Sequence, residues 1–316
     1  MENSKDYTFI EQCRGGENLP EIDYLANSHL PKDRCLAAAG YAVTGLRESF
    51  EKIGRLVFDN DSTVRNDAII ALGVSGDSRA YFVLANIFLK AEDIYDKDVQ
   101  SAKRSVLYAF KSSRDPRAVE LTKLAEKTDG LEEIAKQTLK DINIAKSQRI
   151  ESELRLFEYN FEDSDTKLES AKSSDLGTII QSLEDLEKIE KILKRRNEGK
   201  LVSELYQTYV VDNEGNFLLG GDIEEHVEVM GGENIIAAGE AIVKKENGNW
   251  IFVELNNRSN GYYPDGSCYE YVKNALKKTG IVFPNEFKEI FPREGWLDSN
   301  LLEVKWKEFN KLLEIE

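Results

Sequence analysis

The apolar positions in the first half of the chain follow a helical period that is interrupted by short polar turns. In residues 61–90, Val64, Ala68, Ile69 and Leu72 fall on one face of a helix. A glycine follows this run, and a second apolar run starts a few residues later. The pattern therefore predicts two helices joined by a tight turn.

The same pattern recurs 38 residues later. The apolar face reappears as Ala102, Val106, Ala109 and Phe110, and the polar turn as Asp115, Arg117 and Ala118 in place of Asp77, Arg79 and Ala80. A helix pair that repeats every roughly 30 to 47 residues is typical of an α-solenoid. Because one pair cannot bury its apolar face alone, the pairs must stack.

The stretch "DSTVRNDAIIALGVSGDSRA" resembles HEAT-type repeats, which read D-x-x-V-R-x-x-A-x-x-A-L-G-x-x-G-D-x-x-A. Weaker units extend the resemblance over about residues 20–147, so residues 1–147 are expected to form one HEAT-like α-solenoid. The resemblance implies a curved stack that binds another macromolecule, usually a protein. It also implies that Arg65 pairs with an Asp of a neighbouring unit, and that Asp77 belongs to the same stacking contacts.

Residues 148–200 are rich in charge and contain no proline. Apolar residues return at helical intervals, and they are Ile179, Ile180, Leu183, Leu186, Ile189 and Leu193. The pattern predicts a helical connector of two helices. It leaves open whether these helices continue the solenoid or pack on its end.

From residue 201 the apolar period shortens to that of strands. Residues 200–212, 217–221, 227–230, 235–245 and 250–257 read as strands, and Asn-Gly at 247–248 predicts a hairpin. A helix is expected over 265–280, a short helix over 283–291 and a closing element over 301–315. Residues 201–316 are therefore expected to form a small α+β domain with an antiparallel sheet.

This part also resembles, more weakly, a module of bacterial toxin-like and effector-like proteins. The matching residues are His226, Ala238, Gly239, Glu240, Asn257, Ser259, Tyr262 and Pro264. The chain departs from the module at Asn260 and Gly261, where the module has Gly and His. The resemblance implies a setting of microbial conflict, and no reaction comes with it.

Two interpretations of the corner at residues 254–265 stay open. If the chain is an enzyme, the catalytic residues are His226, Glu240, Ser259 and Tyr262. The imidazole and a carboxylate would do acid–base work with Ser259 or Cys268 as nucleophile, or the tyrosine would stack a nicotinamide in an NAD-using transferase.

In the structural interpretation the corner is only a strand-to-helix turn. Asn257, Asn260 and Gly261 build it, because Asn and Gly tolerate left-handed backbone, and Pro264 starts the helix. Turn chemistry explains every residue type at the corner, so this interpretation is the simpler one.

Composition narrows the function classes. The formal net charge of −16 argues against a nucleic-acid partner and favours a protein partner with a basic surface. Three dispersed cysteines and two histidines give neither a disulfide framework nor a metal site, and no cofactor is expected. The start "MENSKDYTFIEQC" does not resemble a signal peptide and no apolar run is long enough for a membrane span, so a cytoplasmic protein is expected.

The sequence thus favours a non-catalytic protein-binding or adaptor protein. One form of this hypothesis is an immunity or regulatory protein in a bacterial toxin or defence system. The alternative is an enzyme, either NAD-using and ADP-ribosyltransferase-like or a hydrolase, with its catalytic residues in the α+β domain and the solenoid as substrate adaptor.

Overall fold

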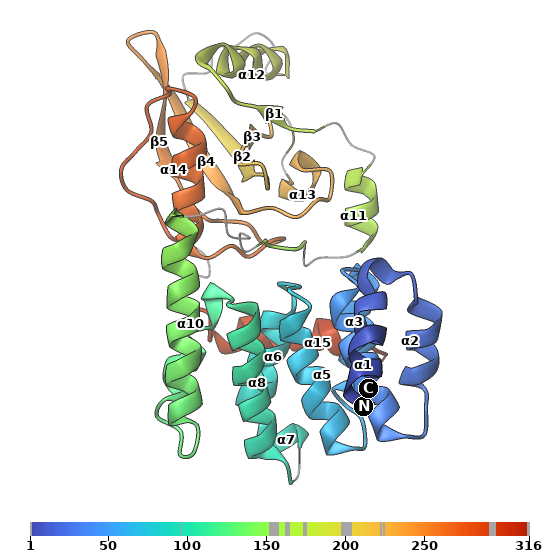
Figure 1. Ribbon diagram of the computed structural model, residues 1–316. Coiled ribbons are helices and arrows are strands. Elements are labelled where there is room, and N and C mark those ends of the chain that lie inside the picture. The colour runs from blue at the N-terminus through green and yellow to red at the C-terminus, as the bar shows by residue number, and fades with distance from the viewer. Residues whose placement is uncertain are drawn as a thin grey trace. The chain divides into compact units, whose positions relative to one another are not determined.

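The computed structural model describes residues 2–95, 97–151, 158–161, 165–172, 176–196, 204–221, 223, 225–290 and 295–314. The chain divides into two compact units (Figure 1). The first, here the helical unit, comprises Met1–Ser147 and Trp296–Glu316, and the second, the α+β unit, comprises Gln148–Gly295. The predicted class of helices followed by an α+β part is confirmed.

The helical unit is built from helix pairs. Its elements are α1 (Glu2–Gln12), η1 (Arg14–Gly16), α2 (Leu19–Ala26), α3 (Pro31–Val43), α4 (Arg47–Leu56), α5 (Ser62–Val74), α6 (Ala80–Leu89), α7 (Ala91–Ile94), α8 (Val99–Ser113), η2 (Pro116–Ala118), α9 (Val119–Ala125), the start of α10 (Glu132–Glu151) and α15 (Ser299–Leu312). The pairs are α3 with α4, α5 with α6, and α8 with α9.

The first helices of successive pairs pack side by side, α3 against α5 and α5 against α8. We call α3, α5 and α8 the first-helix row and α4, α6 and α9 the second-helix row. The contact between α5 and α8 is backbone to backbone, because a Cβ on Gly73 would lie 2.2 Å from the carbonyl oxygen of Ala109. Gly73 and Ala109 therefore set this spacing.

The predicted boundary of the last domain differs from the structure. Residues 201–316 were expected in one α+β domain, but Trp296–Glu316 belong to the helical unit. The reason is visible in α6, where every residue from Ala80 to Phe88 is buried. A helix that is apolar on all sides needs cover on two faces, and α15 supplies the second cover.

The α+β unit is organised around one antiparallel sheet. The strands are β1 (Thr178–Ile179), β2 (Glu204–Val211), β3 (Phe217–Leu219), β4 (Ala237–Glu246) and β5 (Asn249–Leu255), in the order β1-β3-β2-β4-β5. The helices are α11 (Asp165–Lys172), α12 (Leu183–Arg196), α13 (His226–Val229), η3 (Gly266–Cys268) and α14 (Tyr269–Lys277). Between β4 and β5, Asn247 and Gly248 both have positive φ, as the hairpin signal predicts.

The two faces of the sheet differ in exposure. Leu205 and Tyr209 on β2 and Val243 on β4 are buried on the face that α14 covers. On the opposite face Tyr206 is 72% exposed, and its cross-strand partner on β4 is Ile242. The partial alternation of the strand sequences therefore reflects one buried face and one partly open face.

Three predicted elements of this unit differ in the structure. Residues 227–230 were expected as a strand, but His226–Val229 form α13, because a four-residue run is too short for its period to be read. Ile179 was expected in a helix, but it pairs with Leu218 in the edge strand β1. The helix begins only at Leu183, where the Asp185 carboxylate accepts hydrogen bonds from the backbone just before it.

The third difference is the short helix expected over 283–291, of which residues up to 290 are described and form no helix. Here the backbone lies along the outer edge of β5. The amide of Phe252 donates to the carbonyl of Val282, and the amide of Lys288 donates to that of Leu255. The edge strand needs partners for its backbone groups, and this segment supplies them.

The charged connector predicted over residues 148–200 belongs to the α+β unit, since its strand β1 extends the sheet.

Candidate functional site

The corner after β5 consists of residues Asn256 to Asp265, and the side chains of Asn256 and Asn257 are buried in it, whereas Asn260 is exposed. Asn256 Oδ1 accepts hydrogen bonds from the backbone amides of Glu240, at 3.0 Å, and Arg258, at 2.9 Å. Asn257 Nδ2 donates to the carbonyl of Pro264 at 3.0 Å, and its Oδ1 accepts from the amide of Ile290 at 2.8 Å. These buried side chains hold the backbone of the corner.

The Ala-Gly-Glu segment of β4 is required by close packing against this corner. A Cβ on Gly239 would lie 1.8 Å from the carbonyl oxygen of Asn256, so only glycine fits. The same carbonyl accepts a hydrogen bond from the hydroxyl of Tyr209 at 2.7 Å. Both contacts are structural, because they hold the backbone carbonyl of Asn256 against β4 and against the Tyr209 side chain of β2.

His226 is placed by the same glycine. Its Nε2 lies 2.9 Å from the carbonyl oxygen of Gly239, which can only accept, so Nε2 carries the proton. Burial lowers the pKa of His226 to about 4. The imidazole is therefore neutral at pH 7, and its second nitrogen is the one that bears no proton.

The other three predicted catalytic side chains differ in their contacts. The hydroxyl of Tyr262 donates to the carbonyl of Glu233 at 2.8 Å, and its ring packs edge-on against Phe161. The carboxylate of Glu240 lies 3.5 Å from a guanidinium nitrogen of Arg258 and is 41% exposed. Among the described residues Ser259 Oγ has no hydrogen-bond partner, although it is buried. Among the described residues, these contacts place no general base next to Ser259.

Cys268, the other nucleophile considered, is fully buried at the end of η3. Burial, with the carboxylates of Asp265 and Glu289, raises the pKa of its thiol well above the usual value. The thiol therefore stays protonated at neutral pH, which is the opposite of an activated nucleophile. Within the described parts of the chain no group of three or more His, Cys, Asp or Glu side chains is arranged to hold a metal ion.

The backbone of the corner differs from the expected one. Asn260 and Gly261 were expected to supply left-handed backbone, but the residue with positive φ is Tyr263, at 51°. Gly261 is needed for another reason, since a Cβ there would lie 2.5 Å from the ring of Phe161. Pro264 is buried, and the residue after it, Asp265, caps η3 by accepting a hydrogen bond from the amide of Ser267.

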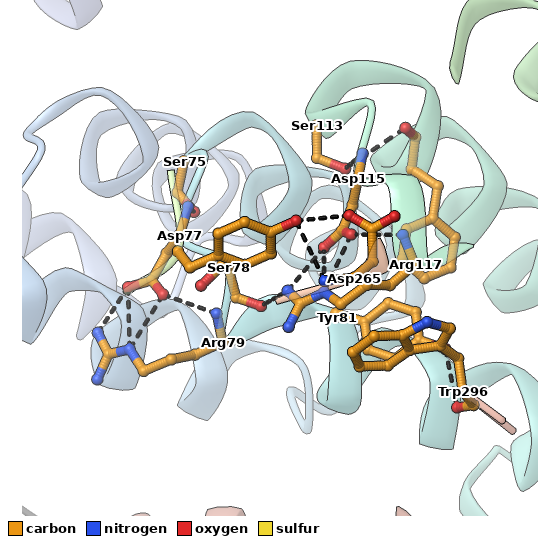
Figure 2. A network of polar contacts seen from close by, with 12 residues as sticks. Ser75, Asp77, Ser78, Arg79, Tyr81, Ser113, Asp115, Arg117, Asp265 and Trp296 are labelled. Atoms are coloured by element: carbon orange, nitrogen blue, oxygen red, sulfur yellow. Dashed lines mark hydrogen bonds and ion pairs between the residues drawn. The ribbon is translucent and has the colours of Figure 1, made fainter. Parts of the chain in front are cut away.

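The helical unit carries a polar motif that occurs twice (Figure 2). The carboxylate of Asp77 pairs with the guanidinium of Arg79, and the carboxylate of Asp115 pairs with that of Arg117. In each case the arginine also reaches back to the preceding helix pair. Arg79 Nη2 donates to the carbonyl of Arg47 at 2.8 Å, and Arg117 Nη2 donates to the carbonyl of Ser78.

A hydroxyl side chain precedes this motif in the same way. The hydroxyl of Ser75 donates to the carbonyl of Leu72, and the amide of Asp77 donates back to it. The equivalent contacts recur at Ser113, and Thr44 makes them in the preceding pair. The turns between the two helices of three successive pairs therefore share one local geometry.

A second set of arginines joins the first-helix row to the next pair. Arg34 pairs with Asp59, which lies just before α5, at 2.7 Å. Arg65 pairs with Asp98, which lies just before α8, at 2.6 Å. The structure thus places Arg65 against an Asp at the entry of the next pair, whereas Asp77 pairs within its own turn. The sequence identifies Arg117 only as the residue that matches Arg79 in the repeat. Nothing in the sequence indicates that the Arg117 side chain is completely buried.

Comparisons of this chain with protein-family models, with curated proteins and with solved structures find no match. Among the described residues no helix has both the length and the apolar character that crossing a membrane requires.

Proposed function

We propose that this chain is a non-catalytic protein-binding protein, in which stacked helix pairs of the HEAT type provide the docking body for a protein partner. One observation carries the proposal, namely the polar motif that repeats at a 38-residue spacing. Arg79 and Arg117 each donate to a carbonyl of the preceding pair. Repeated contacts between neighbouring units are what stacking of helix pairs requires, and stacked pairs present extended binding surfaces.

The acidity of the chain supports a basic surface on the partner. The formal net charge of the chain is −16. Charge complementarity of this kind speeds encounter and suppresses wrong partners. The resemblance to toxin-like modules supports an immunity or regulatory role beside a bacterial toxin or defence protein.

The corner gives no support to the enzyme alternative. Its polar side chains hold backbone groups, as the bonds of His226, Asn257 and Tyr262 show. A general base needs a side-chain atom within reach of a substrate proton. Nε2 of His226 is bonded to Gly239, so only its unprotonated Nδ1 could act as a base, and among the described residues no hydrogen bond joins this ring to Ser259 or Cys268. The thiol of Cys268 is protonated at neutral pH.

The proposal is tested by capture of a partner on the immobilised full-length chain, followed by hydrogen exchange of the isolated complex. We expect slower exchange in helices of the first-helix or second-helix row, and affinity that falls as salt rises. A matched control is Tyr206→Ala, which changes a well-exposed side chain of the α+β unit and is expected to leave binding unchanged. Failure to retain any protein, or protection confined to residues 204–290, would contradict the proposal.

A further inference from the structure

The C-terminal segment crosses the whole second-helix row. At its start, the amide of Trp296 donates to the carboxylate of Glu120 on α9 at 3.1 Å. In its middle, Asn86 on α6 donates to the carbonyl of Leu302 at 2.9 Å. Near its end, the ring of Phe309 packs against α4, as the next contacts show. Residues 296–313 thus meet the three helix pairs in the reverse of their order along the chain.

The row is shaped to receive a helix with aromatic side chains. Phe50 and Phe309 pack edge to face, with ring centroids 5.8 Å apart, and Trp306 lies against Phe58. Gly54 forms the floor at this point, because a Cβ there would lie 2.9 Å from the ring of Phe309. A side chain at position 54 would therefore close the seat of this anchor.

The start of the segment is fixed over a buried cation. The guanidinium of Arg117 lies 4.9 Å from the ring centroid of Tyr81 and 5.6 Å from that of Trp296. The hydroxyl of Tyr81 donates to the carbonyl of Trp296 at 2.9 Å (Figure 2). The row therefore binds the segment both by apolar anchors and by directed polar contacts.

One buried amide of the groove is incompletely satisfied. Asn86 Nδ2 donates to the carbonyl of Leu302, but Asn86 Oδ1 has no hydrogen-bond partner among the described residues, although it is inaccessible to solvent. A buried acceptor without a partner is unfavourable, so this occupant leaves a contact that another helix with a suitable donor can make.

We propose that the second-helix row is a helix-binding groove, that residues 296–313 are its intramolecular occupant, and that an amphipathic partner helix with aromatic anchors binds there by displacing them. The inference rests on the proposed protein-binding function and names the surface and the chemistry of the partner. The groove does not stay empty, since Tyr81, Phe82 and Phe50 would then face water. One helix replaces another, and the occupant competes at an effective concentration on the order of millimolar.

The test uses full-length protein and a labelled synthetic peptide of residues 296–314. Phe309→Ala weakens the intramolecular helix and leaves the groove intact, so we expect it to bind the peptide at least about tenfold more tightly than the wild type does. Phe309→Leu should show a smaller gain. Val304→Ala is the matched control on the same helix, because Val304 is 52% exposed, and it should show no gain. Adding Gly54→Ala to Phe309→Ala should remove the gain, because it closes the seat of Phe309.

Two results would overturn this inference. One is that Phe309→Ala and Phe309→Leu stay folded but bind the peptide no better than Val304→Ala does. The other is that both variants unfold, which would make residues 296–313 a permanent part of the core. A competition experiment with the peptide and a captured partner separates the two proposals. If the peptide neither displaces the partner nor binds to the Phe309→Ala variant, the groove is ruled out and the proposed protein-binding function remains. Peptide exchange without any captured partner leaves only the groove.

Discussion

Buried polar groups serve different purposes in the two units. In the helical unit the Asp-x-Arg motif occurs at Arg79 and again at Arg117, and each arginine ties its helix pair to the one before. In the α+β unit the buried amides of Asn256 and Asn257 hold one corner and the backbone next to it, and this corner is not part of a repeat. A contact that recurs in each helix pair places its residues at a constant spacing, which can be recognised in the sequence. A contact that occurs once in the fold produces no such spacing.

The buried charges show the same contrast. Arg117 is completely buried and is held by Asp115, a carbonyl of the preceding pair and three aromatic rings. Asp265 is buried too, but its partners are the hydroxyl of Tyr159 and the residues it caps. Arg117 links two neighbouring helix pairs, whereas Asp265 caps the short helix η3 and binds Tyr159.

The largest expected effect is at the arginine of the repeated motif. Arg117→Ala leaves the carboxylate of Asp115 buried without its partner, and we expect a loss of about 3–5 kcal/mol in the free energy of unfolding. Arg79→Ala removes the equivalent but less buried arginine and should cost less. Urea unfolding of the full chain measures both. Equal losses would show that burial does not distinguish the two copies of the motif.

Each unit has a glycine packed directly against a backbone carbonyl, and substituting alanine there compares how much an added methyl group destabilises the two units. We expect Gly239→Ala to cost about 3 kcal/mol, because its Cβ would meet the carbonyl of Asn256 at 1.8 Å. Gly73→Ala should cost somewhat less, since its Cβ would meet Ala109 at 2.2 Å between two helices that can shift. Thermal unfolding with a crystal structure of each variant checks this. Gly76→Ala is a contrasting variant, because its Cβ has open space and its loss reports the strain of the left-handed backbone alone, which Gly73 and Gly239 do not have.

Acid should destabilise the α+β unit through His226. Its pKa is about 4 in the folded chain, below the ordinary value of about 6.5, so the unfolded chain takes up the proton first as pH falls. The contribution of the neutral imidazole is fully present above pH 6.5 and is lost towards pH 4. At pH 5 the loss relative to pH 7 is roughly 2 kcal/mol.

The measurement is the difference in urea midpoint between pH 7 and pH 5 for the wild type and for His226→Gln. The glutamine amide can still donate to the carbonyl of Gly239 but does not titrate, so it should reduce the pH dependence. An unchanged dependence would contradict the assignment to His226, because the carboxylates with lowered pKa values, such as Asp23 and Asp59, lose their stabilisation only as pH falls below about 4.

The sequence indicates the periodic features of this fold and misses those that depend on a single contact. The helix pair around Val64 and its copy 38 residues later are both visible as apolar periods, and so is the Asn247-Gly248 hairpin. The place of residues 296–316 is not, because only the chain's fold reveals what covers the second face of α6. The clue was present, since "AYFVLANIFL" has no polar face, but it does not name the covering segment.

The candidate site shows the same limit at the level of single residues. The residue types of the corner predict a turn, and the structure contains one. Which residue takes the left-handed backbone is decided by packing, because the ring of Phe161 occupies the space beside Gly261 and Tyr263 has the positive φ. The sequence also brings His226 and Glu240 into one hypothesis, whereas in the structure His226 bonds to a backbone carbonyl next to Glu240.

The smallest expected effect is at Glu240, and it separates a turn from an active site. Its carboxylate is partly exposed and lies 3.5 Å from Arg258, so Glu240→Gln should change the free energy of unfolding by less than about 0.5 kcal/mol. Partner capture should not change either, because the amide of Asn256 bonds to the backbone of residue 240 and not to its side chain. Asn256→Ala is the matched comparison: it removes the acceptor for two backbone amides and should be clearly the more destabilising of the two. A Glu240→Gln chain that is as stable as the wild type but has lost a measurable NAD-hydrolysis or ADP-ribosylation activity would instead establish the corner as catalytic.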